Sequence, residues 1–67
     1  MTIIYNNTPL ILPSEILLLS DLVKWKNLPS QGNAIALNDR LIKQEKWSNT
    51  ELHDLDRVTV ITAAFGG

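Results

Sequence analysis

The stretch that decides the fold is RVTVITAAFGG, residues 57–67, on which the sequence ends. Apolar and polar side chains alternate along its first part, which predicts a half-buried β-strand over residues 57–64. Val58 and Val60 share one face of this strand and are expected in the core, whereas Ile61 lies on the other face. We therefore expect a strand that leads directly into a thin diglycine tail.

The diglycine is the part of the chain with usable chemistry. Because glycine has no Cβ, Gly66 and Gly67 can enter a narrow channel that a side chain would obstruct. The Gly67 carboxylate is inert by itself, but an ATP-using partner can convert it to an acyl adenylate that a sulfur or amine nucleophile attacks. Such a partner has to hold the carboxylate close to the nucleotide. Residues 63–67 are expected to form a flexible tail, as chain termini usually do.

The outward face of the last strand leads toward this tail. Ile61, Ala63 and Phe65 alternate with the core-facing valines and are expected to form an apolar strip. We predict that this docking strip contacts a partner protein. Replacing Ile61 with Asp should then weaken partner binding and leave the fold intact.

Upstream of the last strand, the sequence predicts a short hairpin and a polar crossover. A β-prone run at 34–37 is followed by the turn pair Asn38-Asp39 and a very short strand at 41–42. In the polar stretch after it, Trp47 is expected to close one end of a small core rather than to be an interface hot spot. Residues 48–50 are expected as loop, and the apolar anchors of the crossover are expected to be Leu52 and Leu55.

The N-terminal residues 2–12 predict another hairpin. Asn6-Asn7 provides a two-residue turn, since Asn tolerates positive φ. The return strand is expected over residues 8–12, with Leu10 and Leu12 on one face and Ile11 on the other. Pro9 lacks an N–H and has to lie where no ladder bond is needed.

A helix is expected between the two hairpins. The apolar stripe has helical spacing, and the helix begins either with Ser14 as its cap or one turn later, near Leu17. Asn27, Pro29 and Gly32 end it. The residues assigned to the stripe are Leu19, Leu22, Val23 and Lys26, widened by Leu18 and Trp25.

This order of elements predicts the fold class. Two hairpins, one crossing helix and a final strand make an α+β domain, a mixed sheet of about five strands with one main helix on one face. Residues 1–67 form a single domain, because a chain this short holds only one core. The sequence has no cysteine, so that core has to depend on aliphatic packing.

Composition excludes several classes of function. The net charge is −1 with both signs interspersed, which argues against a nucleic-acid partner. The longest apolar run, residues 16–19, is far too short for a membrane span, and the N-terminus lacks the basic region of a signal peptide. We expect a soluble, cytoplasmic protein that is a monomer when free.

No side chains suggest catalysis or metal binding. His53 is the only histidine and is expected to be a solvated loop residue. Asp54 and Asp56 are expected to form a turn that satisfies backbone N–H groups, not an acid–base pair. The sequence therefore predicts no enzyme, no catalytic residue, no metal site and no bound cofactor.

The whole pattern resembles the ubiquitin-like β-grasp fold and, within it, the ThiS family of sulfur carriers of bacterial thiamine biosynthesis. The family has an Asn turn, a short strand, a Trp after a polar stretch, an Asp-led last strand and a glycine tail. The likeness covers the whole chain in layout. The matching stretches are ALNDRLI (36–42), EKW (45–47), LHDLDRV (52–58) and AAFGG (63–67), and LLSDLV (18–23) resembles the start of the family's helix.

The resemblance implies a reaction sequence for Gly67. A ThiF-type adenylating enzyme would activate its carboxylate with ATP, a cysteine-desulfurase persulfide would supply sulfur to give a thiocarboxylate, and thiazole synthase would take that sulfur into the thiazole ring. One departure is Leu55, which stands where many relatives place a glycine. Three alternatives stay open: the small subunit of molybdopterin synthase, a ubiquitin-like protein modifier, and an interaction domain with an inert tail.

Overall fold

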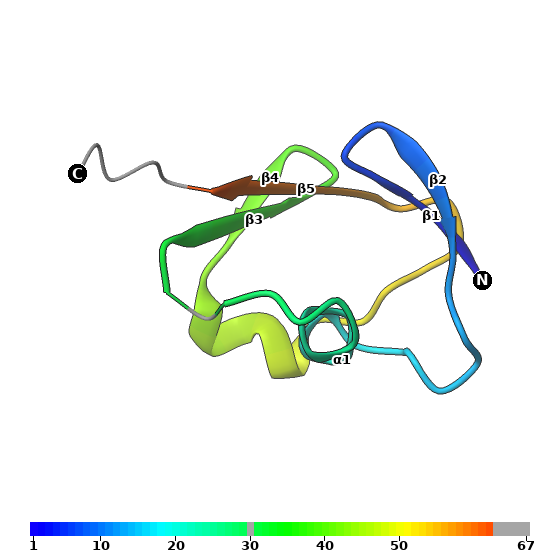
Figure 1. Ribbon diagram of the computed structural model, residues 1–67, viewed down its shortest axis with the longest axis horizontal. Coiled ribbons are helices and arrows are strands. Elements are labelled where there is room, and N and C mark those ends of the chain that lie inside the picture. Colours follow the sequence, from blue (N-terminus) through cyan, green and yellow to red (C-terminus); the bar gives the residue numbers. More distant parts are fainter. Residues whose placement is uncertain (30, 63–67) are drawn as a thin grey trace.

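The computed structural model describes residues 1–29 and 31–62, and its strands form one mixed sheet in the order β2-β1-β5-β3-β4. The central strand β5 is parallel to β1 and antiparallel to β3. Both helices lie on the same face of the sheet (Figure 1). This arrangement confirms the predicted α+β class. The elements are β1 (Thr2–Tyr5), β2 (Thr8–Ile11), α1 (Leu19–Trp25), β3 (Asn33–Leu37), β4 (Arg40–Ile42), the 3₁₀ helix η1 (Gln44–Asn49) and β5 (Arg57–Thr62).

Both predicted hairpin turns are confirmed. Asn6 and Asn7 have φ of 46° and 68°, and Asn38 and Asp39 have φ of 51° and 68°. Left-handed backbone at both central positions defines the type I′ turn, whose twist matches that of the flanking strands. Pro9 lies in β2, one of the two edge strands of the sheet, where the ladder tolerates a missing N–H.

The start of α1 is set by a residue inside the helix. The Asp21 carboxylate accepts hydrogen bonds from the backbone N–H groups of Leu18 (3.0 Å) and Leu17 (3.3 Å). These bonds satisfy the backbone N–H groups of the two residues that precede the helix. The helix therefore begins at Leu19, after the later of the two predicted starts, and the expectation that Ser14 caps it is wrong.

The end of α1 is a complete Schellman motif. Asn27 adopts left-handed backbone (φ 56°) and donates its N–H to the carbonyl of Lys24 at 3.1 Å. Leu28 donates its N–H to the carbonyl of Val23 at 2.9 Å, and its side chain packs against the core. Asn27 thus ends the helix as the sequence predicts.

The core lies between α1 and the sheet. Trp47 is only 5% exposed, and its indole N–H donates to the carbonyl of Ile42 at 3.0 Å. The prediction that Trp47 closes one end of the core is therefore confirmed, as is the burial of Leu52. The buried hydrophobic residues are Ile3, Leu12, Ile16, Leu19, Leu22, Val23, Ile35, Trp47, Leu52 and Val58.

The prediction for the second tryptophan is wrong. Trp25 is 42% exposed, because at 3.6 residues per turn it points about 110° away from the mean direction of the buried helix residues. Lys26, the C-cap residue of the helix, is exposed as well, and its ammonium group is 4.9 Å from the centre of the Tyr5 ring. Partial burial of Tyr5 disfavours its ionised form and so raises its pKa.

The 3₁₀ helix η1 is an element that the sequence does not predict. Its residues are polar except for Trp47, so no apolar period marks them. The single buried Trp and the Thr50 hydroxyl, which donates to the Lys46 carbonyl at 2.7 Å, fix this short helix instead. The predicted loop over residues 48–50 is therefore partly helical.

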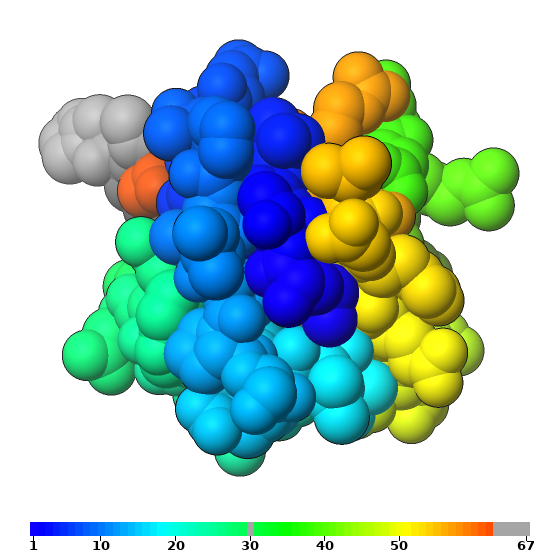
Figure 2. Space-filling model, turned by 90° about the vertical axis from the view of Figure 1, so that its right-hand side faces the viewer, coloured from blue at the N-terminus to red at the C-terminus, as the bar shows by residue number. Residues whose placement is uncertain are grey.

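Leu55 is not the apolar anchor that the sequence predicts. Its side chain is 65% exposed and its φ is 67°. The Asp56 N–H donates to the carbonyl of His53, so Leu55 occupies the third position of a type II turn, which requires positive φ. The Leu55 N–H donates to the carbonyl of Thr2 at 2.6 Å, which holds this loop beside β1 (Figure 2).

This conformation explains why a glycine suits the position of Leu55. Left-handed backbone costs a residue with a Cβ about 1–2 kcal/mol. We expect Leu55→Gly to raise the free energy of unfolding by about 1 kcal/mol, because the exposed side chain contributes little packing. Urea unfolding measures the change. Leu55→Ala is the control, since it removes the side chain but keeps the Cβ; equal stabilities of the two variants would contradict the explanation.

Candidate functional site

Near the end of β5, Ile61 lies on the face of the sheet opposite the helices. Its side chain is 54% exposed, whereas Val58 is fully buried and Val60 is partly buried against the core. Thr59 is exposed as well. The predicted division of β5 into a core face and an outer face is therefore confirmed.

The outer face around Ile61 is apolar across three strands. Ala34 is the cross-strand partner of Ile61, and Ala36 is the partner of both Thr59 and Leu41. Leu41 is 67% exposed. We call Ala34, Ala36, Leu41 and Ile61 the outer apolar patch. Three of these residues were not predicted, because the sequence does not reveal which residues lie beside Ile61 in the sheet.

The structure places only one of the predicted site residues. Ile61 lies on the outer face as expected, but Ala63, Phe65, Gly66 and Gly67 lie outside the described residues, as does the predicted flexible tail. The predicted strand over 57–64 is observed as Arg57–Thr62. Its start agrees with the prediction, and its last two residues are again outside the described part.

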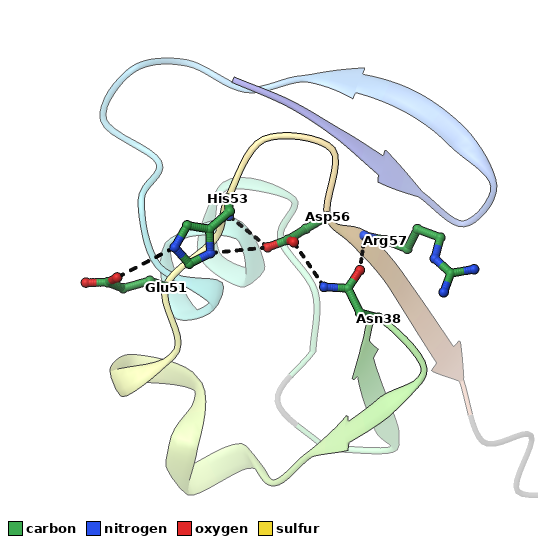
Figure 3. A network of polar contacts seen from close by, with 5 residues as sticks. All are labelled: Asn38, Glu51, His53, Asp56 and Arg57. Carbon is green, nitrogen blue, oxygen red and sulfur yellow. Dashed lines mark hydrogen bonds and ion pairs between the residues drawn. The ribbon is translucent and has the colours of Figure 1, made fainter.

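A polar network at the start of β5 fixes the opposite end of the strand (Figure 3). The Asn38 side chain accepts a hydrogen bond from the Arg57 backbone N–H (2.9 Å) and donates one to the Asp56 carboxylate (3.0 Å). The other Asp56 oxygen accepts the backbone N–H of His53 at 2.8 Å. These bonds join the β3–β4 turn, the loop before β5 and β5 itself.

The network has the character of a structural clamp, not of a catalytic site. The ring nitrogens of His53 are 3.7 Å from Asp56 and 3.9 Å from Glu51, and the side chain is 72% exposed. Asp54 accepts the backbone N–H of Thr2 at 2.8 Å. His53 is therefore a solvated loop residue and both aspartates satisfy backbone donors, as predicted.

The remaining chemistry of the described residues is limited. Within residues 1–29 and 31–62, no three His, Cys, Asp or Glu side chains come together in a way that would hold a metal ion. Over the same residues, no helix is both long enough and apolar enough to cross a membrane.

The sheet order, the single main helix across one face and the central last strand define a ubiquitin-like β-grasp domain. The chain belongs to the ThiS family, whose model matches residues 3–67. It is also similar to the crystal structure of a thiamine biosynthesis protein (ThiS) from Geobacter metallireducens, with a TM-score of 0.85, 20% sequence identity and complete coverage of both chains. No curated protein matches the sequence. The family match shows the family of the chain, and the structural likeness shows its fold.

Proposed function

We propose that this chain is the sulfur carrier of thiazole formation and that the carboxylate of Gly67 carries the sulfur. The observation that bears most weight is the family match, which extends through residue 67 and so includes Gly66-Gly67. It favours this role over the small subunit of molybdopterin synthase and over a ubiquitin-like modifier. The site of action would be the cytoplasm.

The chemistry takes place at the carboxyl carbon of Gly67. A Gly67 oxygen attacks the α-phosphorus of ATP on a ThiF-type enzyme, and pyrophosphate leaves. The terminal sulfur of a cysteine-desulfurase-derived persulfide then attacks the acyl carbon, and AMP leaves. A thiol then attacks the cysteine sulfur of this acyl disulfide and forms a new disulfide with it, which releases the thiocarboxylate whose sulfur thiazole synthase uses. Gly66 provides the clearance that lets the tail reach the nucleotide.

The chain itself supplies recognition and position. β5 lies between β1 and β3 in the centre of the sheet, so the strand that precedes the tail is supported on both sides over its first half. The docking strip that begins at Ile61 and the outer apolar patch around it would contact the activating enzyme and the synthase. A direct test of the first step is ATP–pyrophosphate exchange by a ThiF-type enzyme; exchange that does not depend on this chain would contradict the proposal.

Ile61→Asp is expected to weaken binding to the activating enzyme by about tenfold or more, since a charge would replace a central apolar contact. The free energy of unfolding should change little because the Ile61 side chain is largely outside the core. Isothermal titration calorimetry measures the binding, and urea unfolding measures the stability.

The matched control is Ile11→Asp. Ile11 is 77% exposed and lies on the edge strand β2, two strands away from β5. This variant should bind as the wild type does. Equal weakening by both substitutions would show that added negative charge, and not the position of Ile61, determines the affinity.

A further inference from the structure

Asn6 contacts the last strand at two points, although 54 residues separate it from Val60. Its backbone N–H donates to the carbonyl of Val58 at 2.9 Å. Its side-chain Oδ1 accepts the backbone N–H of Val60 at 2.8 Å. A residue of the β1–β2 turn thus holds the strand that leads to the proposed reactive end.

These contacts extend the parallel ladder beyond the end of β1. The backbone pairing of β1 with β5 stops at Tyr5 and Val58, because the chain turns away toward β2 at Asn6 (φ 46°). If β1 were longer, one of its backbone carbonyls would accept the hydrogen bond from the Val60 N–H. Here the Asn6 side chain accepts it instead. The support on this side of β5 therefore reaches Val60.

On the opposite side of β5, backbone pairing extends over a longer part of the strand. β3 pairs with β5 up to Thr62, which lies opposite Asn33. Among the described residues, Val60 is thus the last one in β5 for which a hydrogen bond on the β1 side of the strand is found. Asn38 makes the corresponding side-chain contact with Arg57 at the start of β5.

We propose that Asn6 is a positioning residue for activation of the C-terminus. Its Oδ1 fixes the direction in which β5 leaves the sheet, and so limits the directions in which the tail can approach the partner's nucleotide. The inference rests on the proposed function and assigns a task within it to a residue that does not touch the reacting atoms.

Three variants separate the effect of the Asn6 side chain from the effect of the turn backbone. Asn6→Gly keeps the left-handed backbone but removes the acceptor. Asn6→Asp keeps an acceptor oxygen. Asn7→Gly makes the same change as Asn6→Gly in the same turn, at a residue for which no side-chain hydrogen bond with the described part of β5 is found. The assay is ATP–pyrophosphate exchange by a ThiF-type enzyme with the complete chain as varied substrate.

Asn6→Gly is expected to lower kcat about threefold to tenfold, the range expected for one lost hydrogen bond. Asn6→Asp and Asn7→Gly should retain the wild-type kcat. A merely structural role gives another result: because the chain is the substrate, partial unfolding reduces its effective concentration and raises the apparent KM while kcat is unchanged.

Amide hydrogen exchange followed by NMR provides a second readout. The Val60 amide should exchange faster in Asn6→Gly than in Asn7→Gly, while the Ile35 amide stays equally protected in both. An unchanged kcat in Asn6→Gly, or an equal loss in Asn7→Gly, would overturn the inference. If the ThiF-type enzyme showed no ATP–pyrophosphate exchange with the wild-type chain, that result would instead contradict the proposed function. The two failures are therefore distinguishable.

Discussion

Deletion of Gly67, or Gly66→Val, is expected to lower ATP-dependent activation of the chain by about 100-fold or more, because small misplacements of reacting groups have effects of this size. Deletion moves the carboxylate back by one residue, away from the α-phosphate. Valine places a branched side chain where the channel has to admit a bare backbone. ATP–pyrophosphate exchange measures both effects.

The fold should be unaffected by these changes, since the described core extends only from Ile3 to Val58. Equal urea unfolding curves for the variants and the wild type would show this. Gly66→Ala is the graded control, because one methyl group obstructs less and should give a smaller loss than valine. Wild-type activation of Gly66→Val would show that the tail does not enter a narrow channel.

Trp47→Ala is expected to reduce the free energy of unfolding by about 3–5 kcal/mol, the usual effect of removing a large buried aromatic. The side chain is 5% exposed and its indole N–H donates to the Ile42 carbonyl. A domain of this length has roughly 3–10 kcal/mol in total. Much of the variant should therefore be unfolded without stabilising additives.

The second tryptophan provides the matched control. Trp25 is 42% exposed, and Trp25→Ala should reduce the free energy of unfolding by about 1 kcal/mol or less. Circular dichroism during urea titration measures both variants. Similar losses for the two would mean that Trp47 does not close the core as the structure indicates.

Local patterns predicted most of the fold because each acts over a few residues. The alternation in β5 identifies Val58 as core and Ile61 as surface, since successive side chains point to opposite faces. The two turns were predictable because Asn and Asp tolerate positive φ. Asn27 likewise marked the end of α1.

Two features of α1 were not predictable in this way. The helix starts at Leu19 because Asp21 binds the backbone before it, and Ser14 offered an equally plausible local signal. The exposed Trp25 fits a broad helical stripe in sequence, and only the short length of α1 and its packing direction show that it lies outside the core.

In the candidate site, too, some residues were predictable from local patterns and others were not. Ile61 was predictable from its own strand, but Ala34 and Leu41 join it only through the register of β3 with its two neighbours. The Asn6 contact with Val60 spans nearly the whole chain, and no local pattern indicates it. Gly66 and Gly67 were proposed as site residues from composition and from resemblance, and they lie outside the described residues.

The most direct measurement is the intact mass of the chain isolated from cells that contain the activating enzyme and are starved of thiamine. The account predicts a species heavier by the replacement of one oxygen with one sulfur, which fragmentation assigns to Gly67 and which is lost when Gly67 is deleted. A chain that retains its unmodified mass under these conditions would contradict the central claim.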